Sequence, residues 1–350
     1  METFWFAVVA LVFTVYIVLD GLDFGVGILY FAVARTDIER RIALRAIGPV
    51  WNGNEVWLIL GGGLSFFAFP RAYASGFSGF YLALILVLWL LMLRGLAIEL
   101  RSHFNHPVWT QIWDVTFSGA SVMLAFVFGV AVGNLIRGVP LNADGYFFTP
   151  FWTTFLPGPD PGILDVYTLF TGLLGVALLA LHGAYFLMMK TEGAVFQRSW
   201  QFAKAGSWAV FPLVLVNLFI LSSLHPAFWE NFSRYPVGYV LPIASTASLM
   251  AMVACSRMGK STGAAVSSCV FILTGLGVTG WAYYPNLLIS TTDPALSLTI
   301  YNSAASDYGL RVGLVWFSIG FPLVLLYTFY AYRSFWGRVT RSSVEGTDGY

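Results

Sequence analysis

Four carboxyl side chains and one guanidinium group stand in otherwise apolar stretches of the first hundred residues. Asp20 and Asp23, in "DGLDFGVG", are three residues apart and share one face if this segment is helical. Glu55 follows in "PVWNGNEVWLILGGG", and Arg94 and Glu99 stand at the end of a third apolar run. Buried carboxyl groups can bind and release protons, and an arginine among them can pair with their charge.

The five side chains in these apolar stretches are four acids and only one base. An ionisable group inside a bilayer costs at least about 2.5–3.5 kcal/mol, so each one needs a partner or a function. One arginine cannot neutralise four carboxylates, so either some acids are protonated at neutral pH, which burial favours, or cations or water come from outside this chain. Two hypotheses follow. At least one acid carries protons toward a reaction, or Arg94 pairs with one acid to lock helices together while the others face loops or water.

The remaining ligand-type side chains give only weak support for a cofactor site. His182, in "LLALHGAYFLMM", is expected to be a packed, hydrogen-bonded histidine rather than an axial haem ligand. The other histidines stand at connections between apolar segments: His103, His106 and His225. Cys255 and Cys269 lie at or within apolar segments, where a structural disulfide is not expected. We therefore predict that this chain binds no metal and no cofactor directly.

The elements that position the acids are membrane helices. Of the 350 residues, 58% are hydrophobic and only 10% are charged, against roughly 25% charged in an average soluble domain. This composition predicts an all-α, polytopic membrane protein. Nine segments reach the length of about 20 apolar residues that a spanning helix needs. They are residues 4–33, 48–69, 77–99, 114–136, 162–189, 206–224, 236–255, 264–284 and 310–332.

No linker, repeat or soluble segment interrupts these spans. We therefore expect a single helical membrane domain over residues 1–340, followed by a short cytoplasmic tail over residues 341–350. The first connection, "RTDIERRIALR", offers Thr36 and Glu39 as a capping box, which predicts a short helix there.

Lys and Arg are unevenly distributed between the two sides of the predicted membrane. One side holds Arg35, Arg40, Arg41, Arg45, Arg101, Lys190, Arg198, Lys204, Arg257, Lys260, Arg333, Arg338 and Arg341. The other side holds only Arg71, Arg137, Arg234 and Arg311. The positive-inside rule places the richer side, and the C-terminus, in the cytoplasm, and the N-terminus outside. The net charge of +1 and the scattered basic residues give no surface suited to nucleic acid.

With this orientation, the depth of each acid can be measured from the cytoplasmic side. At a rise of 1.5 Å per residue, the two aspartates lie roughly 18–23 Å from the cytoplasmic end of their helix, and Glu55 and Arg94 lie about 10–12 Å from theirs. Acids that stay protonated and step inward from the cytoplasm are what a proton pathway requires.

Several stretches resemble subunit II of the cytochrome bd-type quinol oxidases of bacterial respiratory membranes. They run in the same order from about residue 20 to 340: "DGLDFGVGILY", "ERRIALRAIGPVWNGNEVWLILGGGLSFFAFPRAYASGFSGFYLALIL", "LRGLAIELR", "GVAVGNLIRGVPLNADGYF" and "LLYTFYAYRSFWGRV". The resemblance implies a nine-helix subunit in the bacterial cytoplasmic (inner) membrane. Its partner would be a haem-bearing subunit I of similar fold, in an enzyme that oxidises quinol and reduces oxygen to water.

In that family the haems, of types b and d or of type b alone, belong mainly to subunit I. This chain would then stabilise the haem subunit and help to conduct cytoplasmic protons, and in a further interpretation oxygen, to the haem site. Membrane lipid, quinone and small accessory membrane subunits are the other partners that the resemblance implies.

Individual positions carry over from the family. Asp20 and Asp23 match an acidic pair assigned to proton uptake or to polar contacts between helices. Asn52 stands where many relatives carry an aspartate, in "WDGN", that is regarded as a proton relay. Because an amide cannot titrate, we expect Glu55, one turn on and on the same face, to take over the proton.

Two further positions match the family pattern. Trp57 corresponds to a tryptophan thought to line an oxygen route, although packing against a neighbouring subunit explains it equally well. Arg94 and Glu99 match the polar end of the third helix, where they are expected to form an ion pair or to anchor water.

Two other classes of function compete with this one. Buried carboxylates and glycine-interrupted helices also mark proton-coupled secondary transporters, which would predict inverted internal repeats that the sequence does not display. The chain could also be a purely structural scaffold subunit. Replacing the acids one at a time distinguishes the two roles in an oxidase, because a scaffold loses assembled haem whereas a proton pathway loses rate.

Overall fold

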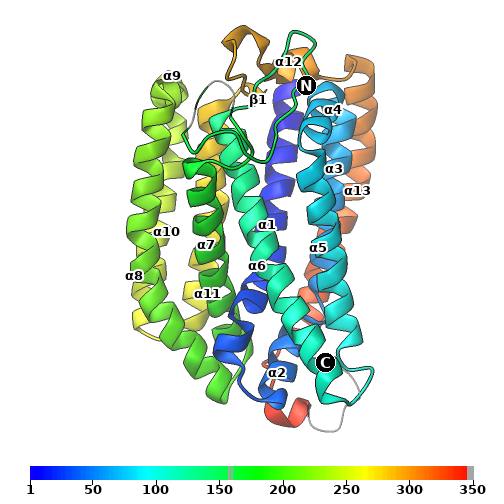
Figure 1. The fold of residues 1–350 in the computed structure, drawn as a ribbon, viewed down its shortest axis with the longest axis vertical. Coiled ribbons are helices and arrows are strands. Elements are labelled where there is room, and N and C mark those ends of the chain that lie inside the picture. Colours follow the sequence, from blue (N-terminus) through cyan, green and yellow to red (C-terminus); the bar gives the residue numbers. More distant parts are fainter. Residues whose placement is uncertain (157, 159–160, 345–350) are drawn as a thin grey trace.

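A computed structural model describes residues 1–156, 158 and 161–344 of the chain. It is a bundle of long helices that run alongside one another (Figure 1). Within the described residues, eight helices are long and apolar enough to cross a membrane. They are α1 (Glu2–Val33), α5 (Tyr81–Leu100), α6 (Pro107–Arg137), α7 (Val166–Lys190), α8 (Gly193–Leu224), α10 (Val240–Arg257, extended by a preceding 3-10 turn), α11 (Ser261–Tyr283) and α13 (Asp307–Ser334). The all-α membrane fold predicted from the sequence is confirmed.

The second predicted span corresponds to α3 (Trp51–Ala68), which lies beside α5 and α13 in the bundle (Figure 1). Its first two turns are rich in polar side chains, and α3 falls short of the hydropathy that the other eight helices reach. The count of nine spans therefore depends on α3 crossing the membrane, which stays a prediction.

Several helix boundaries differ from those that hydrophobicity predicted. Pro70 begins a separate helix, α4 (Pro70–Gly79), so α5 starts at Tyr81 rather than at residue 77. Helix α6 starts at Pro107 rather than at residue 114, and α8 starts at Gly193 rather than at residue 206. An apolar window detects only the part of a helix that faces lipid or core, and these helices continue beyond it as polar turns.

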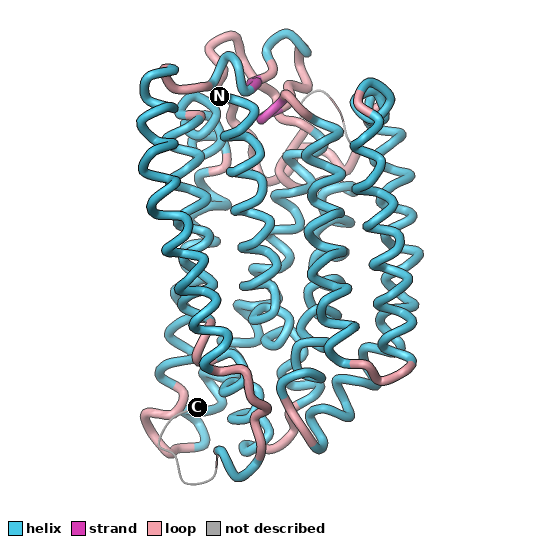
Figure 2. Tube along the Cα trace, turned by 180° about the vertical axis from the view of Figure 1, so that it is seen from behind, coloured by secondary structure: helices cyan, strands magenta, loops and turns pink. Residues whose placement is uncertain are grey.

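The two ends of the bundle are built differently. One end, called here the α2 end, carries α2 (Asp37–Ile47) and the C-terminal segment with the short turn η4 (Arg341–Ser343). The N-terminus lies at the opposite end, together with α9 (Glu230–Arg234), α12 (Ile300–Ser303) and the antiparallel pair of β1 (Asn286–Leu288) and β2 (Leu298–Thr299) (Figures 1 and 2). Residues 345–350 of the predicted tail lie outside the described residues.

Helix α2 begins as the sequence predicted. The Thr36 side chain accepts a hydrogen bond from the Glu39 backbone N–H, and the Glu39 carboxylate accepts one from the Thr36 backbone N–H. This capping box satisfies N–H groups that the first turn of a helix leaves without partners. Because the box fixes where α2 starts, it also fixes which of its charged side chains turn toward the bundle.

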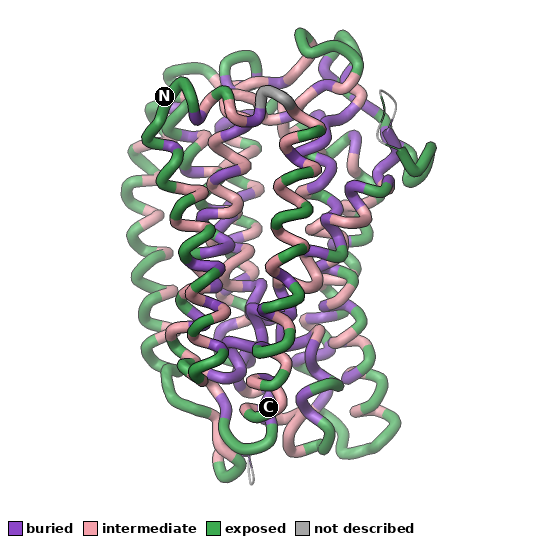
Figure 3. The backbone as a smooth tube through the Cα atoms, turned by 90° about the vertical axis from the view of Figure 1, so that its left-hand side faces the viewer, coloured by how far each residue is buried: buried purple, intermediate pink, exposed green. Residues whose placement is uncertain are grey.

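The core of the bundle forms around α1 and α7. Within the chain, 67% of the apolar stretch of α7 is buried, against 0% for α13. Figure 3 shows this difference, with buried backbone on inner helices and exposed backbone on outer ones. Glycines let the two central helices approach closely, since a Cβ on Gly25 would lie 2.6 Å from the Gly183 Cα. The aspartates of α1 are therefore carried on one of the most enclosed elements of the fold.

Candidate functional site

Arg94 holds two of the predicted acids together. Its Nη2 atom lies 2.6 Å from Glu55 Oε1 and 2.7 Å from Asp20 Oδ1. Arg94 and Asp20 are fully buried, whereas 24% of the Glu55 side chain is exposed. The three residues come from α5, α3 and α1, so one guanidinium group connects three helices. The Arg94 Cζ atom also lies 4.4 Å from the centre of the Phe24 ring, a cation–π contact.

The second aspartate has a different partner. Asn54 Nδ2 donates hydrogen bonds to Asp23 Oδ2 at 2.8 Å and to the Leu19 carbonyl oxygen at 3.2 Å. The Tyr332 hydroxyl donates to Asn54 Oδ1 at 3.1 Å. This amide therefore fixes the Asp23 carboxyl from one side and reaches α13 on the other. Asp20, Asp23, Asn54, Glu55 and Arg94 are called the acid cluster below.

Several polar atoms in and beside the acid cluster are buried without a hydrogen-bond partner among the described residues. Two of them are Arg94 Nε and Arg94 Nη1. A buried polar group that lacks a hydrogen bond costs roughly 1–3 kcal/mol, and bound water commonly satisfies such groups. The chemistry of the cluster therefore suits water, which can also relay protons between carboxyl groups.

Two predicted residues are not brought into the acid cluster. Asn52 is exposed, and the asparagine that bonds to Asp23 is Asn54, which the sequence analysis missed. Glu99 is also exposed and lies about 140° around α5 from Arg94. The ion pairs that the structure gives Arg94 go to Asp20 and Glu55, and the expectation that Arg94 and Glu99 form an ion pair or anchor water stays a prediction.

Trp57 packs inside this chain. Only 1% of its surface is exposed, and its ring makes an edge-on contact with Phe321 of α13, with the ring centres 6.2 Å apart. The interpretation that Trp57 packs against a neighbouring subunit is therefore wrong. Its assignment to an oxygen route stays a prediction.

His182 is a packed, hydrogen-bonded histidine, as predicted. Its Nε2 atom lies 2.9 Å from the Val18 carbonyl oxygen, and its Nδ1 atom lies 2.7 Å from Ser268 Oγ. Because a carbonyl can only accept, Nε2 carries the proton, and Nδ1 contacts the serine hydroxyl, which also lies 2.8 Å from the Ala265 carbonyl oxygen. Both ring nitrogens have protein partners, so this side chain does not fit an axial haem ligand.

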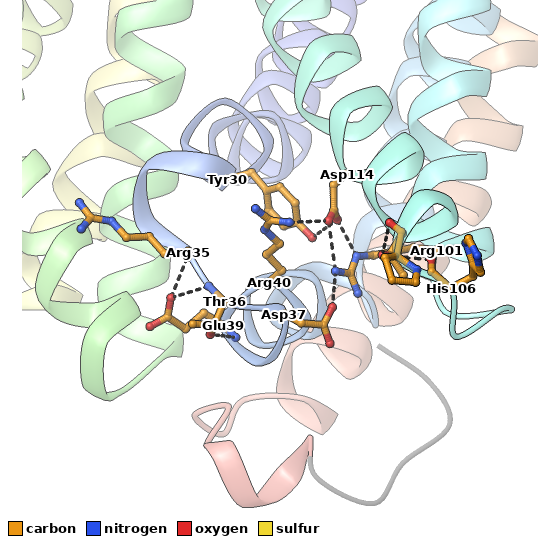
Figure 4. Close-up of polar contacts among 11 residues, drawn as sticks. Tyr30, Arg35, Thr36, Asp37, Glu39, Arg40, Arg101, His106 and Asp114 are labelled. Atoms are coloured by element: carbon orange, nitrogen blue, oxygen red, sulfur yellow. Dashed lines mark hydrogen bonds and ion pairs between the residues drawn. The ribbon is translucent and has the colours of Figure 1, made fainter.

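A second polar network lies at the α2 end and was not predicted (Figure 4). Asp114, buried on α6, accepts hydrogen bonds from the Tyr30 hydroxyl at 2.7 Å and from Arg40 Nη1 at 3.0 Å. It also accepts from Arg101 Nε at 2.6 Å, and Arg101 Nη2 donates to Asp37 Oδ1 at 2.8 Å. The network thus ties α2 to α1, to α6 and to the end of α5.

The charged side chains at the α2 end form ion pairs of opposite sign. Burial by itself lowers the pKa of the Arg101 guanidinium, but the hydrogen bond to Asp114 and the nearby negative charge outweigh burial and raise that pKa. On the other side of α2, Arg198 Nη1 donates to Glu39 Oε2 at 2.8 Å, and this hydrogen bond holds the pKa of Glu39 below its usual value. The hydrogen bonds of these two arginines therefore keep α2 attached to the bundle.

Comparison with known proteins gives one consistent result. Residues 1–335 match the sequence model of the family described as "Cytochrome bd terminal oxidase subunit II". The chain is 31% identical to the cytochrome bd-I ubiquinol oxidase subunit 2 of Escherichia coli (strain K12), over 97% of this chain and 96% of that one. It is 30% identical to the cytochrome bd ubiquinol oxidase subunit 2 of Bacillus subtilis (strain 168), over 95% and 96% of the two chains.

The fold agrees with this result. A chain of the bd oxidase from Geobacillus thermodenitrificans superposes with a TM-score of 0.69 at 18% identity, covering 95% of this chain and 98% of that one. The family match extends over nearly the whole sequence and includes every residue of the acid cluster. The chain belongs to the family of cytochrome bd terminal oxidase subunit II.

Proposed function

We propose that this chain, a subunit of a respiratory terminal oxidase, conducts protons through the acid cluster toward a haem-bearing partner subunit and helps to hold that subunit in place. The partner would carry the haems, of types b and d or of type b alone. Within the complex, quinol would be oxidised and oxygen reduced to water. The observation that supports the proposal most directly is the contact of one buried arginine with acids from two other helices.

Charge balance indicates that the acid cluster carries protons. Its three carboxyl groups can hold three negative charges, whereas Arg94 supplies one positive charge. An unpaired carboxylate in a low-dielectric interior is costly, and the cost falls when the group binds a proton. The cluster is therefore expected to hold at least one exchangeable proton at neutral pH.

The position of Glu55 gives the protons an exit. Asp20 and Asp23 are fully buried, whereas Glu55 is partly exposed on α3. On the same helix Ile59 is 74% exposed, so this face presents apolar surface beside the carboxyl group. A partner that covers this face would take up protons from Glu55.

The proposed direction of transfer rests on the distribution of basic residues. Arg40 and Arg45 are on α2, and Arg101 and Arg198 pair with Asp37 and Glu39 of the same helix, so all four arginines lie at the α2 end, which the positive-inside rule assigns to the cytoplasm. In this orientation protons for making water would come from the cytoplasm of a bacterial cell, through its cytoplasmic membrane. Each proton that crosses a potential of 100 mV corresponds to about 2.3 kcal/mol, so the side of uptake has energetic consequences.

Replacing Glu55 with glutamine tests the proton role. In the assembled oxidase, Glu55→Gln is expected to slow quinol-driven oxygen consumption roughly tenfold or more, since a positioned proton-transfer group typically contributes 10²- to 10⁴-fold. The haem absorption spectrum should stay unchanged, because the amide is nearly the same size and can still accept a hydrogen bond from Arg94.

Glu230 supplies the matched control for this experiment. It is exposed on α9, at the opposite end of the bundle, so Glu230→Gln should keep the normal rate. An unchanged rate of Glu55→Gln at every pH would remove this carboxyl group from the pathway.

A purely structural role is the second candidate, and the Arg94 contacts favour it because they link three helices. Under that role, Glu55→Gln would reduce assembled haem and turnover in proportion. The transporter alternative has no support from the comparisons, since the chain belongs to an oxidase family. Small accessory subunits, lipid and quinone remain expected partners of the complex.

A further inference from the structure

A cavity of about 360 Å³ lies at the α2 end of the bundle. The ends of α2, α3, α7 and α13 surround it, together with the C-terminal segment, residues 335–344. At roughly 30 Å³ per water molecule, it has room for about twelve waters, or for a phosphodiester group with its glycerol. Gly337 and Arg338 belong to its wall and are exposed, so the cavity is accessible from outside the bundle at this end.

Three of the described residues that line this cavity are basic, and none of them is acidic. Arg45 comes from α2, Lys190 from the last position of α7 and Arg338 from the C-terminal segment. Three separate parts of the chain thus bring positive charge to one enclosed space. Such a concentration of like charge attracts an anion.

Lys190 is held in place without losing its charge. Its Nζ atom donates hydrogen bonds to the carbonyl oxygens of Phe335 and Gly337, and the Val339 N–H donates to the Lys190 carbonyl oxygen at 2.7 Å. Carbonyl oxygens carry no net charge, so these bonds fix the ammonium group but do not neutralise it. An ammonium group has three N–H donors, which leaves one for a ligand beyond these two bonds.

Arg338 has an acidic neighbour, but the pair is loose. Its Nη1 atom lies 3.5 Å from Glu192 Oε1, against about 2.7–2.9 Å in a close charge-assisted hydrogen bond. About half of each side chain is exposed, and exposed ion pairs contribute little to stability because water and salt screen them. A guanidinium group has five N–H donors, so Arg338 can bind a phosphate group while Glu192 stays nearby.

The rim of the cavity has the composition of a membrane interface. Phe335 and Trp336 line the cavity directly after α13 ends, and both side chains are exposed. Tryptophan is enriched at the headgroup level of membranes. Leu325 and Phe329 are exposed on α13, seven and three positions before the lining residue Tyr332, so apolar surface continues from the cavity along the helix.

We propose that this cavity binds a phosphate group, and that an anionic phospholipid of the cytoplasmic leaflet supplies it. Basic pockets between membrane helices on the cytoplasmic side are known sites for the headgroups of anionic lipids. The basic side chains of the lining bind the phosphate, and the apolar surface of α13 holds the acyl chains. The inference goes beyond the proton role of the acid cluster and does not depend on it.

Free inorganic phosphate offers the same chemistry to the basic side chains. The lining also includes Val50, Phe186 and Met189, which are apolar. Inorganic phosphate has no apolar part that could cover these side chains, whereas a phospholipid has one. The lining as a whole therefore favours the lipid.

Lipid binding to the purified oxidase, followed by native mass spectrometry, tests the site. The delipidated wild-type complex should bind dioleoyl phosphatidylglycerol more tightly than dioleoyl phosphatidylcholine. In Arg45→Gln/Arg338→Gln, the affinity of this site for phosphatidylglycerol should fall roughly 25-fold, since each basic side chain near an anionic lipid contributes about fivefold. The variant should then retain one phosphatidylglycerol molecule fewer per complex than wild type at the same lipid concentration.

Arg338→Gln alone keeps the test valid if the double variant assembles poorly. The Arg338 side chain is about half exposed, so this variant should assemble, and the affinity of the site should fall about fivefold. Arg333→Gln is the matched control. Arg333 is exposed near the same end of α13 but does not line the cavity, so its loss should leave lipid binding unchanged.

Three further outcomes are decisive. Wild-type retention of phosphatidylglycerol by both cavity variants would overturn the proposal. An equal loss in Arg333→Gln would also overturn it, because the effect would then come from surface charge in general. Displacement of phosphatidylglycerol by inorganic phosphate, at an ionic strength matched with chloride, would support the phosphate site but overturn the lipid as its occupant.

The two proposals fail separately. If Glu55→Gln leaves the rate of oxygen consumption unchanged, the proton role of the acid cluster fails and the lipid site is unaffected. If the cavity variants keep their lipid, the lipid site fails and the proton role still stands.

Discussion

Replacing Arg94 with leucine is expected to prevent assembly of the oxidase. Removing one partner of a buried ion pair typically costs about 3–5 kcal/mol, and Arg94 contacts two acids rather than one. That cost is a large share of the roughly 5–15 kcal/mol that stabilises a folded protein. Both subunits and the haem absorption should be nearly absent from membranes that express Arg94→Leu, as measured by immunoblot and by spectra of the solubilised complex.

A double variant separates the structural role of Arg94 from the proton role. Of the two carboxyl groups that lose Arg94, Asp20 is the fully buried one, so removing it as well, as Arg94→Leu/Asp20→Leu, should restore part of the assembled haem. Turnover should stay low, because one acid of the pathway is missing. Arg94→Lys keeps the charge but loses the planar fork that reaches two acids, so it should assemble only partly. Normal amounts of haem in Arg94→Leu would show that these ion pairs do not hold the helices together.

The contact of Arg94 with buried acids could be predicted from the sequence, because the free-energy cost of burying each unpaired charge is so large. Asp20, Glu55 and Arg94 stand in separate apolar segments, and a bilayer gives each of them few acceptable neighbours other than one another. The structure brings all three within ion-pair distance. The sequence left open how many acids pair with the arginine, since that depends on the depth and rotation of each helix.

The choice between Asn52 and Asn54 shows where prediction from sequence ends. Side chains two positions apart on a helix point about 160° away from each other. The rotation of α3 therefore decides which of the two amides faces the core. Contacts with α1 and with Tyr332, which is 278 positions away in the sequence, set that rotation. A motif match that assigned the relay position to Asn52 had no information about those contacts.

The network around Asp114 was missed for a similar reason. Asp114 stood at the first residue of a predicted span, where a carboxyl group is expected to reach water. In the structure α6 begins earlier and α2 folds against it, so this carboxyl group is buried between Arg40 and Arg101. The capping box at Thr36 was predictable because it depends on neighbouring residues alone.

Replacing Gly25 with alanine is expected to destabilise the whole subunit strongly. A Cβ at this position would lie 2.1 Å from the Leu179 carbonyl oxygen and 2.6 Å from the Gly183 Cα, and backbone atoms cannot turn away as a side chain can. Helices α1 and α7 would have to separate at the centre of the bundle. The cost should exceed the roughly 1–3 kcal/mol of an ordinary overpacked core position, and should appear as lost subunit in membranes and a lower unfolding temperature in detergent.

Gly119 offers the matched control, because it is an exposed glycine within α6 and a Cβ there meets no described atom within 4 Å. Gly119→Ala should leave stability unchanged or raise it slightly, since alanine favours a helix over glycine by about 1 kcal/mol. The separation of α1 from α7 in Gly25→Ala must also displace the acids, because Asp23 lies two residues away on the same helix. Any residual complex of Gly25→Ala should therefore turn over slowly, and a stable complex with the normal rate would show that α1 and α7 do not need this close approach.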